Sequence, residues 1–369
     1  MKDITIVIPA FKAEKTIEKT LSSINTQTIR DQLEVIIACD DPKDDYKNII
    51  KQFPNLEIRQ LPCEKNGGAG VARQRGLDQA TTHWVAFIDA DDMFASPFAM
   101  EQLGIAIEKD VIEVQGVFAQ VCPFPDGTQF LAHSELEHPW VFGRLYNVDF
   151  LRQSKIEFSH LRAMEDGEFN WKIRLITEGT NLKIKQIQDC IYYWMPNSEH
   201  SITRTGEKDG IPQYNFDLCQ IGATIASKQA TDFARKYNPF NGSINRFITE
   251  QMIRHYFTYV ECIGRRPEFA KQNLWLGKYF YHECYKQIET TVSEDIIKNM
   301  YTQMNVGSAN SLVGIIPCIS FFDWFKMVKE EEYSRDEIKD IRAELSEEII
   351  ANDIKTGVID ENCSIFTGK

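Results

Sequence analysis

The sequence predicts an α/β fold in which a mostly parallel, doubly wound sheet is flanked by helices and followed by a mostly helical C-terminal region. Short apolar runs alternate with amphipathic segments from residue 4 to residue 88, which is the pattern of consecutive βαβ units. Two of the apolar runs, ending at Cys39 and Ile88, lead directly into acidic residues. Ligands of open α/β sheets bind at such carboxyl ends. Beyond about residue 215 the long β-branched runs disappear and helical periodicity dominates.

The first βαβ unit is predicted by residue type and spacing. The run from Ile4 to Ile8 is β-branched and ends at Pro9, as expected of a first strand. Apolar residues then recur at helical spacing between residues 13 and 28, so an amphipathic helix is expected to pack against the sheet. A second buried strand is expected at 33–39. The remaining elements expected in this region are a short polar helix at about 43–52, a third strand at 57–61 and a fourth strand at 84–88.

A glycine-rich turn from Asn66 to Gly70 precedes a helix that carries Arg73 and Arg75. The turn is not a P-loop, because no Gly-Lys-Ser/Thr follows it. It is not a dinucleotide fingerprint either, because it does not follow the first strand. Together with acids at the neighbouring strand ends, arginines here could serve a nucleoside diphosphate.

After residue 92 the regular alternation ends. A helix is expected at 97–107, strands near 111–121 and 184–194, and a helix that opens at Glu165-Asp166. The expected helices of the C-terminal region are 215–236, 243–263, 270–290, 293–304 and 334–350. We therefore expect two domains, 1–212 for nucleotide binding and catalysis and 213–369 for acceptor binding or oligomerisation.

Composition limits the function classes. The chain has 369 residues, a net charge of −13 and a pI near 5.1, which disfavours extended nucleic-acid binding. No apolar window approaches the roughly 18 residues of a membrane span. The nine Cys are scattered without a CxxC pair, so we expect reduced thiols and a cytoplasmic protein. The apolar stretch 311–325 is expected to be core or a homo-oligomer interface. A peripheral contact with the inner face of the membrane is the alternative, although the acidic run 330–332 would be repelled by anionic lipid.

The acidic cluster Asp89, Asp91 and Asp92 suggests chemistry. Three carboxylates within four residues raise one another's pKa values unless a cation or donors lie among them. Hard oxygen ligands suit Mg²⁺ or Mn²⁺, and these ions suit a diphosphate. The alternative is a solvated acidic turn.

Six blocks in order give the sequence a specific resemblance to a known family. It resembles the family-two glycosyltransferases of the GT-A fold over roughly residues 3 to 205. The blocks are Ile6–Glu14, Glu34–Asp41, Asn66-x3-Gly70-x2-Arg73-x2-Gly76, Phe87–Asp92, Phe142–Tyr146 and Glu165-Asp166.

The resemblance implies an inverting glycosyltransferase that moves a sugar from a nucleotide-sugar, a UDP-sugar, to a hydroxyl of a surface or secreted glycan. It also implies a divalent cation, Mn²⁺ or Mg²⁺, and Asp166 as the catalytic base. The implied donor contacts are Pro9, Phe11, Glu14, Asp40, Gly70, Arg73, Asp89 and Ala90, and the implied metal ligands are Asp91, Asp92 and His200.

The sequence departs from the family pattern in two places, and several residues have alternative roles. The usual Asp-Asp-Gly-Ser after the second strand is here Cys39-Asp40-Asp41-Pro42, and the usual Tyr-Asn of the first block is Phe11-Lys12. Asp166 could be a helix N-terminal acid, with Glu165 as the competing base. Three other classes remain: a glycosyltransferase acting on a modified DNA base, a non-catalytic binding module, and a nucleotidyltransferase. The residues with structural alternatives are Arg73 and His200 as surface groups, and Trp140 and Tyr146 as core aromatics in place of acceptor contacts.

Overall fold

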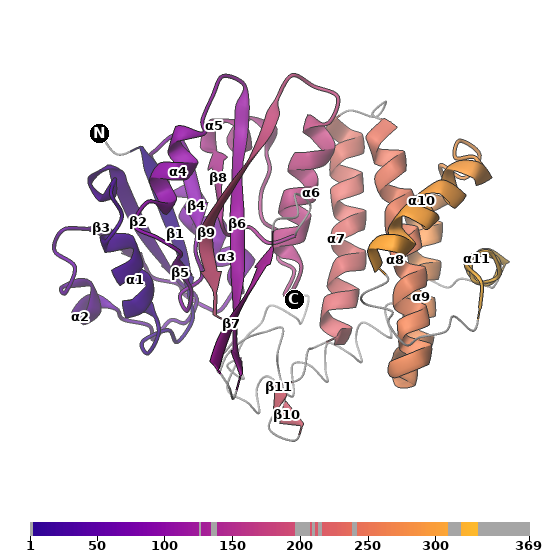
Figure 1. Ribbon diagram of the computed structural model, residues 1–369, viewed down its shortest axis with the longest axis horizontal. Helices are drawn as coiled ribbons and strands as arrows, with labels where there is room; N and C mark the ends of the chain where they lie inside the picture. Colours follow the sequence, from indigo (N-terminus) through magenta and orange to yellow (C-terminus); the bar gives the residue numbers. More distant parts are fainter. Residues whose placement is uncertain are drawn as a thin grey trace. The chain divides into compact units, whose positions relative to one another are not determined.

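The computed structural model describes residues 3–124, 127–133, 139–195, 207–208, 211–212, 216–237, 242–308 and 319–330 of the chain. These residues separate into two compact units. The first unit contains the described residues up to Ile173 and from Gly179 to Pro212, and the second contains Arg174–Glu178 and those from Phe216 onward. The functional division at 212/213 stays a prediction. Figure 1 traces the chain from the sheet of the first unit to the helices of the second.

The first unit is built on one mixed sheet, whose nine described strands follow the order β3-β2-β1-β4-β8-β6-β9-β5, with β7 beside β6. The first four strands are parallel, as the alternation predicts. Strand β8 is antiparallel to both β4 and β6, β9 is parallel to β6, and β5 is antiparallel to β9. The strands are β1 (Ile4–Ala10), β2 (Leu33–Cys39), β3 (Glu57–Leu61), β4 (Trp84–Phe87), β5 (Met93–Phe94), β6 (Val111–Phe124), β7 (Gly127–His133), β8 (Arg144–Asn147) and β9 (Lys183–Trp194). The mixed order extends the parallel half, β3-β2-β1-β4, with a mostly antiparallel second half.

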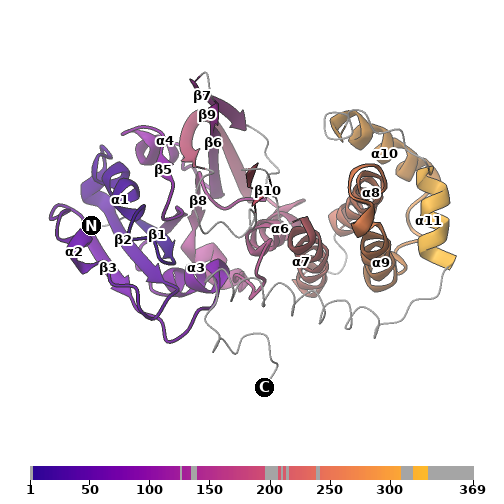
Figure 2. The same ribbon diagram turned by 90° about the horizontal axis from the view of Figure 1, so that it is seen from below.

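Helices cover both faces of this sheet (Figure 2). Ile6 and Ile8 of β1 pack in one buried cluster with Leu21 of α1 and Met100 of α4. The other face of β1 meets α3, where a Cβ at Gly76 would lie 2.3 Å from Cγ1 of Val7. The helical segments of the unit are α1 (Ile17–Asn25), η1 (Arg30–Gln32), α2 (Lys47–Ile50), α3 (Ala69–Asp78), α4 (Ala99–Ile105), α5 (Val148–Ser154) and α6 (Glu165–Thr177), and a small hairpin pairs β10 (Glu207–Lys208) with β11 (Ile211–Pro212).

The second unit is helical in its described part, as the periodicity predicts. Its core is aromatic: Tyr256 and Trp324 are buried with ring centroids 5.7 Å apart, and Phe321 packs against both. In the described end of the apolar stretch 311–325, Phe321 and Trp324 are therefore core residues, whereas Phe322 is 40% exposed. The helical segments are α7 (Phe216–Tyr237), α8 (Gly242–Arg265), η3 (Pro267–Phe269), α9 (Ala270–Phe280), η4 (Tyr281–Tyr285), α10 (Glu294–Ser308) and α11 (Phe321–Glu330).

Two of the helices expected in the second unit are the segments 270–290 and 334–350. The helical segment expected at 270–290 is present up to Tyr285, with α9 passing at Tyr281 into a π-helical turn, η4, in which Tyr281 and Tyr285 are buried. The helix expected at 334–350 lies outside the described residues. Of the helices that the structure describes, none is long and apolar enough to span a membrane.

Candidate active site

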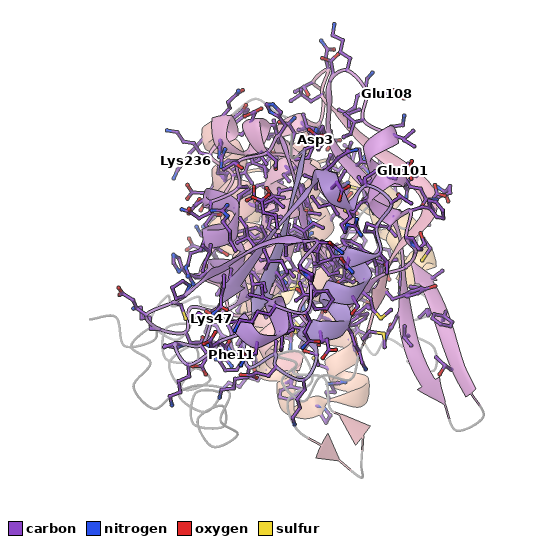
Figure 3. The ribbon with its side chains drawn as sticks, turned by 90° about the vertical axis from the view of Figure 1, so that its left-hand side faces the viewer. Asp3, Phe11, Lys47, Glu101, Glu108 and Lys236 are labelled. Carbon is purple, nitrogen blue, oxygen red and sulfur yellow. The ribbon has the colours of Figure 1, made fainter. Side chains whose placement is uncertain are left out.

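The carboxyl ends of three neighbouring parallel strands gather the predicted site at one edge of the sheet. Strands β2 and β4 pair with β1 on either side, so the residues that follow the three strands come together. Figure 3 shows Asp3 and Phe11 at opposite ends of β1, with Lys47 at the same end as Phe11. This edge carries Asp40 after β2 and the acidic turn after β4.

Asp40 holds the glycine-rich loop that precedes α3. Its two carboxylate oxygens accept hydrogen bonds from the N–H groups of Gly67 and Gly68, at 2.7 and 2.9 Å. Gly68 has φ +85°, a left-handed conformation that favours glycine. Asp40 is only 5% exposed, and burial raises its pKa to about 6 even though both hydrogen bonds favour the ionised form. The carboxylate therefore shapes the loop, and its predicted contact with the nucleotide is a separate role that stays a prediction.

The β1–α1 loop supplies the other predicted nucleotide contacts. Pro9 and Phe11 are half-buried and Glu14 is exposed. The Nζ atom of Lys12 lies 4.9 Å from the centroid of the Phe11 ring, so Lys12 places a positive charge beside a residue predicted to contact the donor. Lys12 has φ 49°, a strained backbone for a non-glycine residue.

Two residues that the sequence did not single out hold this strained loop. The carboxylate of Asp44 accepts the backbone N–H of Lys12 at 3.2 and 3.3 Å. The hydroxyl of Tyr46 donates to Asp44 at 2.8 Å and accepts the N–H of Ala13 at 3.0 Å. Tyr46 is fully buried. A tyrosine in the polar stretch 43–52 was the only sequence signal that could have identified this support.

Arg73 connects the acidic turn with the start of α6. One terminal nitrogen lies 2.7 Å from Oδ1 of Asp89, and the other lies 2.7 Å from Oε1 of Glu165. Arg73 is 5% exposed. Burial opposes its charge, but Asp89, Glu165 and Asp166 raise its pKa above the ordinary value. The structure thus brings together residues that lie 92 positions apart in sequence.

Gly70 makes this approach possible. A Cβ atom at this position would lie 2.7 Å from the carbonyl oxygen of Ser159 and 2.9 Å from Cγ of Glu165. Any side chain would therefore push α3 away from the segment that leads into α6. The glycine predicted to contact the nucleotide has this packing function in the structure, and its donor contact stays a prediction.

The acidic turn is fixed from β9. The Tyr192 hydroxyl donates to Oδ2 of Asp92 at 2.5 Å and accepts the N–H of Asp89 at 3.2 Å. The N–H of Met195 donates to Oδ1 of Asp92 at 2.6 Å. Asp92 is 1% exposed, and burial, followed by the charges of Asp91 and Asp89, raises its pKa well above the ordinary value. Both oxygens of Asp92 are thus engaged by protein donors, so its geometry favours a structural role over the predicted metal ligation.

The remaining members of the turn differ in exposure. Ala90 is buried, Asp89 has a side-chain exposure of 31%, and Asp91 is half-buried. His200, the third predicted metal ligand, lies outside the described residues. Within the described part of the chain, no group of three His, Cys, Asp or Glu is arranged to hold a metal ion.

A cation shared with a diphosphate nevertheless fits this edge of the sheet. Mg²⁺ and similar ions are commonly held by one or two carboxylates together with substrate phosphates and water. Asp91 supplies one carboxylate, whose hard oxygen atoms are the ligands that such ions prefer. The donor set is therefore suited to a cation that arrives with its diphosphate rather than to a preformed cage.

Asp166 lies at the start of α6 and is half-buried. Its Oδ1 accepts the N–H of Gly167 at 2.7 Å. Burial and the neighbouring charge of Glu165 raise its pKa to about 7, and the positive charge of Arg73 limits the rise. A carboxylate with a pKa near neutrality is suited to general-base catalysis.

The aromatic candidates separate in the structure. Tyr146 is fully buried, and its hydroxyl donates to Oδ1 of Asn170 at 2.8 Å, so it is a core residue. Asn170 donates to the carbonyl oxygens of Pro139 and Trp140 at 2.7 and 3.0 Å. Trp140 is half-buried, and a hydrogen bond therefore ties its backbone to the helix that carries Asp166.

A buried ion pair joins β6 and β8. Arg144, part of one of the six sequence blocks, contacts Glu113, and their side chains are 4% and 1% exposed. No sequence pattern points to Glu113 as its partner, since strand pairing across a mixed sheet determines that contact.

Comparisons with known proteins agree with this geometry. The pattern of Glycosyl transferase family 2 matches residues 5–164. The poly(ribitol-phosphate) β-N-acetylglucosaminyltransferase TarP of Staphylococcus aureus is 32% identical over 306 residues, which are 76% of this chain and 88% of TarP. Glycosyltransferase GlyA of Streptococcus pneumoniae is 26% identical over 207 residues, or 47% of this chain, and the match spans only 28% of the length of GlyA.

A solved structure supports the fold. S. aureus TarS 1–349 in complex with UDP-GlcNAc aligns with a TM-score of 0.62 at 17% identity, covering 83% of this chain and 92% of TarS 1–349. The sequence match to TarP extends over most of both chains. On these grounds the chain belongs to glycosyl transferase family 2 and has the GT-A fold.

Proposed function

We propose that this chain moves a sugar from a UDP-sugar to an acceptor hydroxyl with inversion at the anomeric carbon. The observation that carries the proposal is the pair of 2.7 Å contacts through which Arg73 joins Asp89 of the acidic turn to Glu165, the neighbour of Asp166. Acids suited to a cation and diphosphate and a carboxyl suited to general-base work therefore belong to one connected cluster in one unit of the chain.

Asp166 is the base in this proposal. It removes the proton from the acceptor hydroxyl as that oxygen bonds to the anomeric carbon, while the bond from the same carbon to the diphosphate breaks and UDP leaves. A single displacement of this kind inverts the anomeric configuration. With its pKa raised to about 7, the carboxylate is a stronger base than an ordinary aspartate and is still substantially ionised near neutral pH.

Asp91 would hold the divalent cation, Mn²⁺ or Mg²⁺, together with the diphosphate oxygens. Such an ion supplies positive charge to the departing diphosphate when it is bound. The half-buried Phe11, with Lys12 beside its ring, would line the donor pocket, and Asp40 would keep the adjoining loop in shape through Gly67 and Gly68.

The relatives suggest the first substrates to test. TarS is named in complex with UDP-GlcNAc, and TarP is named for transfer of N-acetylglucosamine to poly(ribitol-phosphate). We therefore infer a UDP-N-acetylhexosamine or UDP-hexose as donor and a hydroxyl of a cell-surface glycopolymer as acceptor. The second unit, in this proposal, contributes to acceptor binding or to oligomerisation.

The test is release of UDP. The purified chain is incubated in separate reactions with UDP-GlcNAc, UDP-glucose or GDP-mannose. Every reaction contains Mn²⁺, and each is run with and without a ribitol-phosphate polymer. We expect UDP release from one UDP-sugar, faster with acceptor, and a loss of at least about 100-fold in the Asp166→Asn variant. Undiminished transfer by that variant would remove the assignment of the base.

The same experiment separates the alternatives. Pyrophosphate in place of UDP would identify a nucleotidyltransferase. Binding of UDP without turnover of any donor would favour a non-catalytic module. Labelled sugar on DNA that contains hydroxymethylated bases would identify a DNA-modifying enzyme.

A further inference from the structure

We propose that Arg73 and Glu165 are positioning residues that hold Asp166 and set the pH range in which it can act, so that Arg73 is not a ligand of the donor nucleotide. The proposal rests on the proposed function, in which Asp166 is the base. It changes the role that the sequence resemblance implied for Arg73.

Arg73 bridges two structural elements. Its two terminal nitrogens reach two carboxylates on two different elements, Asp89 after β4 and Glu165 at the start of α6, each at 2.7 Å. A guanidinium that binds a phosphate frequently presents two N–H groups to that one anion. Here the two nitrogens instead span the gap between two elements, and Nε is buried without a hydrogen-bond partner among the described residues.

The bridge between Arg73 and Glu165 is buried. Arg73 is 5% exposed and Glu165 7% exposed, so a diphosphate cannot reach the guanidinium without displacing one of its two carboxylate partners. A buried ion pair that loses one partner leaves an uncompensated charge, which is strongly destabilising. The arrangement is therefore a fixed cross-link, with Asp89 as its more exposed end.

Asp166 lies in a cluster that contains more carboxyl groups than cations. The charged groups that face it are Glu165 on its own helix, Asp89 on the acidic turn and Arg73 on α3, and Tyr146 of β8 lies within electrostatic range as a neutral phenol. Three carboxyl groups thus share one guanidinium. Without that positive charge the cluster would take up protons, because buried like charges cannot all stay ionised.

The proposal predicts pH shifts of opposite sign for two variants. Glu165→Gln keeps an oxygen that can accept from Arg73 but removes a negative charge beside Asp166, so the acid limb of kcat should move down by about one pH unit. Arg73→Met removes the positive charge, so the limb should move up by about one unit or more. A merely structural role would lower activity at every pH without moving the limb.

The assay is Mn²⁺-dependent release of UDP from UDP-GlcNAc between pH 5.5 and 9, with kcat and donor KM measured separately. The matched control is Arg59→Met, which breaks another Arg–carboxylate ion pair of the same sheet, that with Glu34. Arg59 lies on β3 and Glu34 near the start of β2, away from the carboxyl edge. Its acid limb should match that of the parent protein.

A readout without turnover keeps the proposal separate from the proposed function. Carboxyl ¹³C NMR of protein labelled at aspartate follows the titration of Asp166, identified by loss of its signal in Asp166→Asn. The same opposite shifts are expected there even if UDP-GlcNAc is not the donor. If Arg73→Met does not fold, Arg73→Gln takes its place, because it also removes the positive charge, and the same upward shift is expected.

Limbs that stay unmoved, or that move in the same direction in both variants, would overturn the proposal. Retention of kcat and its pH limb in Arg73→Met, with only donor KM raised at least about tenfold, would also overturn it, because that is the signature of a nucleotide ligand.

Discussion

Tyr192 offers a test of how the acidic turn is held, since it contacts that turn from β9 rather than from the turn itself. Replacement by Phe keeps the ring, which stacks on Phe142 with centroids 4.4 Å apart. It removes only the hydroxyl that donates to Asp92 at 2.5 Å and accepts from Asp89 N–H at 3.2 Å. Tyr192 is fully buried, so water cannot readily replace the lost contacts.

The size of the effect follows from these two contacts. A hydrogen bond to a charged group contributes about 1.5–3 kcal/mol, and an unpaired buried donor costs about 1–3 kcal/mol. Because such terms are not additive, we expect the unfolding free energy to fall by about 2–4 kcal/mol. The hydroxyl of Tyr192 also favours the ionised form of Asp92, so its loss raises the pKa of that acid further. In the folded Tyr192→Phe variant, Asp92 can take up a proton at low pH, which offsets part of the loss. The destabilisation should therefore be larger at pH 8 than at pH 5.5.

Calorimetric unfolding at both pH values measures this effect. The corresponding shift in midpoint is roughly 4–15 °C for a unit of this size. The control is Tyr193→Phe, the next residue on β9, which is half-buried and whose ring contacts Phe130. Equal effects of the two substitutions, or a Tyr192→Phe variant as stable as the parent at pH 8, would refute the reasoning that the hydroxyl fixes the turn.

Three further predictions concern α3, α4 and the carboxyl edge of the sheet. Gly76→Ala should lower the unfolding free energy by about 1–3 kcal/mol, because its Cβ would lie 2.3 Å from Val7. Gly104→Ala in α4 meets nothing within 4 Å and should instead be neutral or stabilise by up to about 1 kcal/mol in urea titrations. Asp40→Asn should weaken UDP binding in calorimetry, because only one of its two hydrogen bonds to the glycine loop can be kept. The native pKa of Asp40 is about 6, so the folded state retains its proton between about pH 4 and 6. The unfolding free energy should therefore fall as pH rises through that window, and in Asp40→Asn this contribution should vanish.

Much of the first unit could be predicted because its signals are local. The strand ends at Cys39 and Phe87 follow from apolar runs that stop at acids, and their convergence on one edge follows from parallel pairing. The structure confirms the parallel βαβ sheet that the alternation of elements predicts and shows its strand order, β3-β2-β1-β4. Family resemblance supplied the rest of the fold, and the comparisons confirm it.

The contacts of individual side chains could not be predicted, because they depend on pairing between distant segments. The nucleotide contact that the resemblance implies for Arg73 stays a prediction, and its two carboxylate partners follow from the meeting of α3 with the start of α6. The metal ligation that the resemblance implies for Asp92 also stays a prediction, and its hydrogen bond from Tyr192 of β9, 100 residues away, could not be predicted. The sequence shows the acids and the arginine, whereas their partners depend on which distant segments meet: Arg73 comes from α3 and Tyr192 from β9.

The central claim is that the acidic turn holds a cation that neutralises the diphosphate of the donor. Titration calorimetry of UDP, with Mn²⁺ and then with EDTA, tests it most directly in the parent protein and in Asp91→Asn. We expect Mn²⁺ to tighten binding by at least about tenfold, or about 1.4 kcal/mol, in the parent and to have little effect in the variant. Equal affinity for UDP with Mn²⁺ and with EDTA in the parent protein would contradict the claim.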